Sequence, residues 1–133
     1  METRDHSLLQ IRGGAIGNTL NASPDEIFQN QTIRPILKLQ NDLFVAAFRN
    51  YVDKYKGDFY HYPVAKKLAF IDNAIHKDIK FRNSLKGMVI AMFTIEEYHT
   101  YIKNSSNLNK RMMNMVIERL QSQAQLFEVH QAS

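Results

Sequence analysis

The feature that most constrains the fold is an uncharged run of nine residues, Gly87 to Ile95. Wound into a helix, this run is apolar on every side, a pattern typical of a segment that is surrounded by other protein. It is also much shorter than the ~20 residues that a helix needs to cross a bilayer. We therefore predict a central core helix at about residues 79–93 and no membrane-spanning segment.

Local signals elsewhere in the chain also indicate helices. Ser23 with Glu26, and Thr94 with Glu97, fit the capping box, in which two side chains three residues apart satisfy the first amides of a helix. Apolar residues recur at helical spacing from residue 36 onward, and the chain has no alternating strand pattern or hairpin turn. The sequence predicts an all-α fold, a single-domain bundle of five or six helices around the central one.

The chain divides at the first capping box. Residues 1–22 lack sustained periodicity and contain three glycines, so we expect a flexible N-terminal segment, with residues 23–133 as the helical domain. Pro35 cannot donate a backbone hydrogen bond, which predicts a break or kink between Gln31 and Arg34. Thr32 is then placed to cap the helix that follows.

Composition excludes several kinds of site. The chain has no cysteine, which removes disulfides, thiolate metal sites and cysteine nucleophiles. With 44% hydrophobic and 23% charged residues it matches globular proteins. The polar start of the chain is not followed by an apolar run of signal-peptide length, so the simplest interpretation is a cytoplasmic protein, and nothing in the sequence requires a cofactor.

The positive charge is concentrated in the second half of the chain. Residues 1–62 hold seven basic and seven acidic side chains, whereas residues 63–133 hold ten and six. Such a stretch is a candidate surface for nucleic acid or another polyanion, although no known nucleic-acid-binding motif accompanies it, and the alternative is a solvated basic face. The candidate residues are Lys66, Lys67, Lys77, Lys80, Arg82 and Lys86.

Two pairs of carboxylate and histidine are candidate metal ligands. Asp72 and His76 are four residues apart, and Glu96 and His99 are three apart, so each pair projects from one helical face. Di-iron helical bundles use two Glu-x-x-His motifs plus two further glutamates, whereas this chain has one. Both pairs also lie beside the apolar stripes, where exposed polar residues normally fall.

Methionine offers a candidate interface. Apart from the first residue, the methionines fall at residues 88 and 92 and at Met112, Met113 and Met115. Flexible thioethers suit both binding grooves and irregular core gaps. Because Met112 and Met113 are adjacent, they point about 100° apart and cannot share one narrow buried stripe. We therefore expect one of them to serve self-association of the chain into a homo-oligomer.

Two polar or aromatic segments leave alternatives open. The loop at residues 59–62 binds a planar ligand or, as is commoner, folds its rings onto the core. Asn30, Gln31, Arg34 and Lys38 surround the expected break at Pro35, and Arg82 with Asn83 surrounds the start of the central helix. These groups either satisfy freed backbone groups or line a small pocket for an anion.

Three segments, at residues 28–38, 78–88 and 107–115, carry a resemblance that covers about residue 23 to the end. On these residues the chain resembles a family of small, all-helical bacterial proteins, some of which carry the name glyoxalase. Glyoxalase I domains are built from βαβββ units and bind metal through His, Glu and Gln on strands. Because this sequence predicts helices, no glyoxalase site residue transfers to it, and the resemblance implies a fold without a function.

Three functional hypotheses follow. The first is a non-enzymatic, soluble protein that acts through protein contacts, as a homo-oligomer. The alternative is a module that binds a polyanion such as nucleic acid through the basic face. The third is a metal protein or enzyme that uses the two carboxylate–histidine pairs.

Overall fold

The structure, a computed structural model, describes residues 2–17 and 20–128. These residues form helices and contain no strand, so the prediction of an all-α single-domain bundle is confirmed. No helix among them is both long and apolar enough to span a membrane. The α-helices are α1 (Glu2–Arg12), α2 (Pro24–Phe28), α3 (Arg34–Leu39), α4 (Asn41–Asp53), α5 (Val64–Lys77), α6 (Ile79–Ile90), α7 (Ile95–Ile102) and α8 (Ser105–Ser122). Shorter turns are the π-helix η1 (Gln29–Ile33) and the 3-10 helices η2 (Phe59–His61) and η3 (Ala124–Phe127).

The capping residues start their helices as predicted. Ser23 accepts a hydrogen bond from the Glu26 amide at the start of α2. Both halves of the second capping box are present, since Thr94 accepts from the Glu97 amide and Glu97 accepts from the Thr94 amide. A cap outside these two boxes is Asp78, which accepts from the Phe81 amide and separates α5 from α6.

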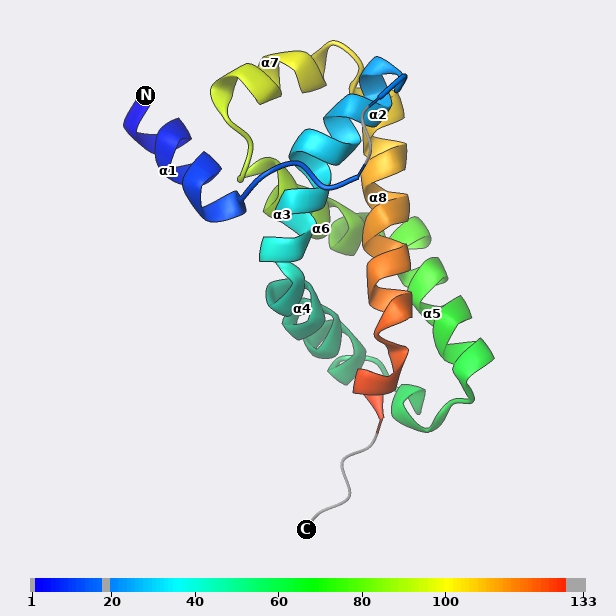
Figure 1. The fold of residues 1–133 in the computed structure, drawn as a ribbon. Coiled ribbons are helices and arrows are strands. Elements are labelled where there is room, and N and C mark those ends of the chain that lie inside the picture. Colours follow the sequence, from blue (N-terminus) through cyan, green and yellow to red (C-terminus); the bar gives the residue numbers. More distant parts are fainter. Residues whose placement is uncertain (1, 18–19, 129–133) are drawn as a thin grey trace.

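The central helix is α8, not the helix at residues 79–93. Figure 1 shows α8 between α3 and α4 on one side and α5 on the other, and it also contacts α6, α7 and η1. Helix α6 ends at Ile90 and is buried on one face only, through Phe81, Leu85 and Val89, while Gly87 is exposed. Glycine has no side chain and alanine only a methyl group, so each adds little apolar area to drive burial, and an uncharged run is not necessarily an enclosed one. A Cβ added at Gly87 would meet nothing within 4 Å, so no helix approaches closely there.

The helix that contains Pro35 is not broken, but the turn before the proline is wider than an α-helical turn. The α2–η1–α3 segment continues through the proline because η1 is a π-helix, in which the Arg34 amide donates to the carbonyl of Gln29. Pro35 removes the N–H that would otherwise meet the Gln31 carbonyl, and an Arg12 guanidinium nitrogen lies 3.5 Å from that oxygen instead. Thr32 does not cap a helix; it is buried and donates to Glu97 at 2.7 Å.

The N-terminal segment contains a helix that the sequence did not predict. Helix α1 lies within the stretch expected to be flexible, of which residues 1, 18 and 19 fall outside the described part of the chain. Its last residue, Arg12, is buried and binds both carboxylate oxygens of Glu97, at 2.6 and 2.8 Å. One buried ion pair therefore joins α1 to the start of α7.

Candidate functional site

One face of helix α5 carries two lysines with an aromatic and an amide side chain between them. Lys66, Phe70, Asn73 and Lys77 recur at intervals of four, three and four residues, so they share one face of the helix. Lys66 is exposed, and its Nζ lies 4.0 Å from the ring centroid of Tyr62. Lys77, also exposed, ends the helix. A lysine therefore stands at each end of this face.

Rings from three segments form a continuous surface beside this face, which we call the aromatic strip. Ring centroids are 6.3 Å apart for Tyr62 and Phe70, 5.5 Å for Phe70 and Tyr55, and 5.0 Å for Tyr55 and Tyr51. Tyr51 in turn stacks on Phe81 of α6 at 4.1 Å. Tyr55 is 50% exposed, so part of the strip offers its rings to solvent.

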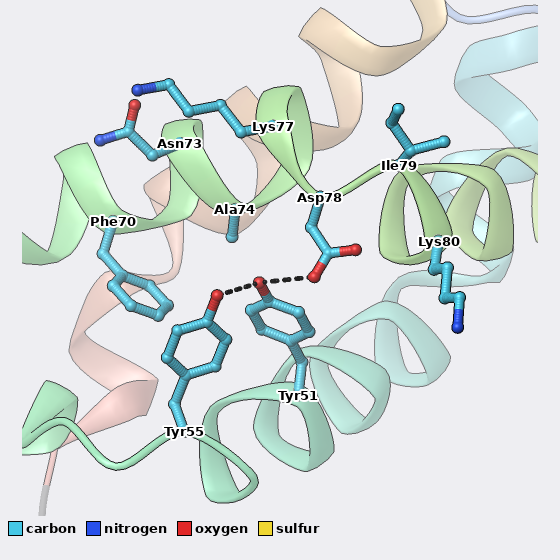
Figure 2. Close-up of a pocket in the computed structure, with 9 residues that line it drawn as sticks. All are labelled: Tyr51, Tyr55, Phe70, Asn73, Ala74, Lys77, Asp78, Ile79 and Lys80. Carbon is cyan, nitrogen blue, oxygen red and sulfur yellow. Dashed lines mark hydrogen bonds between the residues drawn. The ribbon is translucent and has the colours of Figure 1, made fainter.

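The strip borders a pocket of about 490 Å³ between the end of α4, the second half of α5 and the start of α6. Figure 2 shows Phe70 and Tyr55 along one side of it, and a line of hydrogen bonds from the Tyr55 hydroxyl to the Tyr51 hydroxyl and on to the carboxylate of Asp78. The side chains of Lys77 and Lys80 extend away from these oxygens. The pocket therefore has an aromatic wall, a polar centre and two lysines at its rim.

The polar centre is a chain of hydrogen bonds that ends on a carboxylate. The Tyr51 hydroxyl donates its one proton to Asp78 Oδ2 at 3.1 Å, so Tyr55 must donate in the 3.0 Å bond between the two hydroxyls. Burial, the hydrogen bond donated to Asp78 and the charge of Asp78 raise the pKa of Tyr51 above its ordinary value. At neutral pH Asp78 and the Tyr55 oxygen are thus left as acceptors, and they suit a ligand that brings N–H donors.

Only some of the residues of the predicted basic face are exposed to solvent. Lys67 is 4% exposed and its Nζ lies 5.9 Å from the ring centroid of Phe59, so its place on an exposed face was wrong. Lys66, Lys77 and Lys80 are exposed, while Arg82 and Lys86 are half-buried on α6. The helical spacing of Lys67 puts it on the buried side of α5, next to Ile71 and Ala74.

The candidate metal ligands are not brought together. On α5, His76 Nδ1 lies 3.1 Å from Asp72 Oδ1, whereas Glu96 and His99 are exposed on α7. No group of three or more His, Asp or Glu side chains in the described part of the chain could hold a metal ion. The two pairs are therefore separate features of two helices.

The candidate interface methionines lie mainly inside the molecule. Met112 and Met113 are both completely buried and Met115 is half-buried. The expectation that one of the adjacent pair stays outside the core is wrong, because α8 packs against neighbours on several sides and buries an arc wider than one stripe. In the single chain neither Met112 nor Met113 is available as a surface.

Sequence analysis missed most of the aromatic pocket. It gave no role in a site to Tyr51, Tyr55, Phe70 or Asp78. The available signal was the spacing of lysines and Phe70 along α5. Of the expected aromatic loop, Phe59 is buried against the core, while Tyr62 joins the strip.

No family model, curated protein or solved structure matches this chain. The function must therefore be argued from the chemistry of the site.

Proposed function

We propose that this protein binds single-stranded nucleic acid along the aromatic strip and the lysines of α5. The observation that carries the proposal is the combination of partly exposed, touching rings with a lysine at each end of the same helical face. Proteins that bind single strands without strict sequence preference combine these two elements, because every base has a face that stacks and every nucleotide has a phosphate.

The length of the surface supports a chain rather than a single nucleotide. Lys66 and Lys77 are eleven residues apart on α5, which corresponds to about 16 Å along the helix axis. Stacked nucleotides advance by 3.4 Å per residue of one strand, so the distance spans roughly five nucleotides. A mononucleotide would reach only one of the two lysines.

The carboxylate in the pocket supports recognition of a base rather than a phosphate. Asp78 would repel an anion, but it accepts hydrogen bonds from an exocyclic amino group, as carboxylates do from cytosine N4. A base that stacks near Tyr55 would bring such donors to Asp78 and to the Tyr55 oxygen. Phosphates would remain at the rim, near Lys77 and Lys80.

The proposal is tested by fluorescence anisotropy with labelled oligocytidine, oligouridine and a duplex of the same length. We expect the oligocytidine to bind most tightly, the duplex least, and affinity to fall as salt is raised. Tyr55→Ala should weaken binding by about 5- to 100-fold, the equivalent of one lost stacking contact. Tyr55→Phe retains the ring but loses the acceptor oxygen, so it should bind less tightly than the original chain and more tightly than Tyr55→Ala.

The contribution of the two lysines is tested separately from that of the rings. Lys66→Gln and Lys77→Gln should each lower affinity and reduce the salt dependence. Lys103→Gln removes one charge from an exposed residue just after α7 and should leave both unchanged. Preferred binding of the duplex, or an equal loss in all three lysine variants, would contradict binding at the strip. Tight binding of free cytidine phosphates alone would assign the pocket to a small nucleotide.

A further inference from the structure

A second site of a different kind lies on the groove between η1, α3 and α8. Three arginines line it: Arg34 at the start of α3, and Arg111 and Arg119, which are eight residues apart on α8. The groove encloses about 460 Å³. None of its lining residues belongs to the aromatic pocket.

Each arginine is held by a neutral amide oxygen. Arg34 Nε donates to Asn30 Oδ1 at 2.8 Å, and Arg111 donates to Gln29 Oε1 at 3.1 Å. Both amides come from the π-helix η1. Amide oxygens orient a guanidinium group without neutralising its charge.

The third arginine has the same kind of support. Arg119 lies 3.4 Å from Asn41 Oδ1, and Asn41 exchanges two hydrogen bonds with Gln123, at 2.8 and 2.7 Å. This reciprocal pair fixes the direction in which the Asn41 oxygen points. Gln123 also donates to the backbone carbonyl of Arg119. The guanidinium of Arg119 therefore contacts one member of a reciprocal pair of side-chain amides.

The charge of the groove is poorly compensated. Within the described residues, Arg34 and Arg119 form no ion pair, and Arg111 has one distant partner, Asp25, at 3.9 Å. Glu118 is the one carboxylate among the lining residues, and it is exposed. Burial and the nearby charge of Arg34 lower the pKa of Arg119, so the two cations repel each other. Like charges held together without a counter-ion cost free energy unless an anion joins them.

We infer that this groove binds a phosphate group. Arg34 and Arg119, whose charges are close enough to interact, come from two helices and can reach one ligand from different sides, which suits tetrahedral oxygens better than the flat fork of one carboxylate. Arg111, about two turns away on α8, adds to the positive charge of the groove. Three arginines and Glu118 leave a formal charge of two, which matches a phosphate monoester with a charge of about −1.5 to −2. Guanidinium groups also form the bidentate bonds that phosphate recognition uses.

The test is calorimetric titration of the full chain with inorganic phosphate and, separately, malonate, with ionic strength held constant by sodium chloride. We expect saturable one-to-one binding of phosphate, tighter than that of malonate. Arg34→Gln and Arg119→Gln should each weaken it about tenfold or more, the equivalent of one charge-assisted hydrogen bond. Lys103→Gln and Tyr55→Ala should bind phosphate as the original chain does, because both positions lie outside the groove.

Thermal unfolding in phosphate-free buffer distinguishes a role of Arg34 in phosphate binding from a role in stabilising the fold. Removing Arg34 relieves repulsion, so Arg34→Gln should be at least as stable as the original chain in phosphate-free buffer and should lose only the stabilisation that phosphate adds. The inference is overturned if phosphate does not saturate, if malonate binds more tightly, or if Lys103→Gln weakens binding as much. It is equally overturned if Arg34→Gln is less stable without phosphate, because the arginine then serves the fold.

Discussion

Replacing Arg12 by methionine should release α1 from the rest of the fold. The Arg12 side chain is 1% exposed and that of Glu97 is 18% exposed, and the two share hydrogen bonds of 2.6 and 2.8 Å. Arg12 also donates to the backbone carbonyl of Met92 at 3.2 Å. Methionine retains the apolar stem of the arginine but none of these donors. The substitution therefore isolates the contribution of the charge and its hydrogen bonds.

The expected cost follows from what remains at Glu97. Removing one partner of a buried ion pair costs about 3–5 kcal/mol, because the other charge stays behind without compensation. Glu97 keeps hydrogen bonds from Thr32 at 2.7 Å and from the Thr94 amide at 2.8 Å. The loss should therefore lie at the lower end, about 3 kcal/mol, or about 10 °C in Tm for a chain of this size.

Urea unfolding and hydrogen exchange together measure this loss. We expect a lower urea midpoint and faster exchange of the α1 amides than of the α8 amides. Arg4→Met is the matched control, because Arg4 lies on the same helix and donates to the carbonyls of Ala91 and Phe93, but its side chain is 48% exposed. The control should cost less than about 1 kcal/mol. An equally small loss for Arg12→Met, with α1 still protected, would refute the reasoning.

The remaining predictions concern pH, the core and two glycines. Burial alone raises the pKa of Glu97, but hydrogen bonds from Arg12, Thr94 and Thr32 and the charge of Arg12 outweigh it and lower the pKa below 4.5. The pair therefore stabilises the fold above pH 4.5 and loses this effect as pH falls through the lowered pKa, so the urea-midpoint difference between Arg12→Met and the original chain should shrink in acid. Met113→Ala should cost about 2–5 kcal/mol by urea unfolding, and Met115→Ala less than about 1 kcal/mol, because only Met113 is fully buried. Gly87→Ala should stabilise by about 0.5–1 kcal/mol, since it adds an alanine to a helix in open space, with the gain measured as a higher Tm. Gly17→Ala should destabilise, because φ is 102° and its Cβ would lie 3.0 Å from the Asn30 side chain.

Sequence reasoning succeeded where the signal is local. Ser23 and Thr94 cap helices because a short polar side chain can reach an amide only a few residues away, whatever the rest of the chain does. The all-α fold follows from such signals together with helical periodicity. Neither requires knowledge of which helices touch.

The centre of the bundle was mispredicted because burial is decided by neighbours. The run from Gly87 to Ile95 has no charge, yet Gly87 and Ala91 are exposed. Helix α8 contains many polar residues, but it contacts several other elements at once, which buries both Met112 and Met113. The average polarity of a helix does not indicate how many sides are covered.

The candidate sites could not be predicted from the sequence for a related reason. The lysines at the ends of α5 share a face that the sequence spacing indicates, but Tyr51 and Tyr55 join them only through the turn between α4 and α5. The arginine groove brings Arg34 beside Arg119. No periodicity joins residues that far apart in sequence, and Arg12 with Glu97 is a further case.

The π-helix η1 contacts both the Arg12–Glu97 ion pair and the arginine groove. Pro35 explains why this turn is π-helical. Because Pro35 has no N–H and would clash with the carbonyl four residues back, the preceding turn widens to the spacing of a π-helix. Residues of this turn then contact two different parts of the molecule. Gln29 holds Arg111 of the groove, whereas the Gln31 carbonyl and the Thr32 hydroxyl face Arg12 and Glu97. π-Helical turns are frequent at functional sites. Here the turn before the proline supplies the side-chain amides that hold Arg34 and Arg111 of the groove. It also supplies the backbone and hydroxyl groups that contact the Arg12–Glu97 pair and so hold α1.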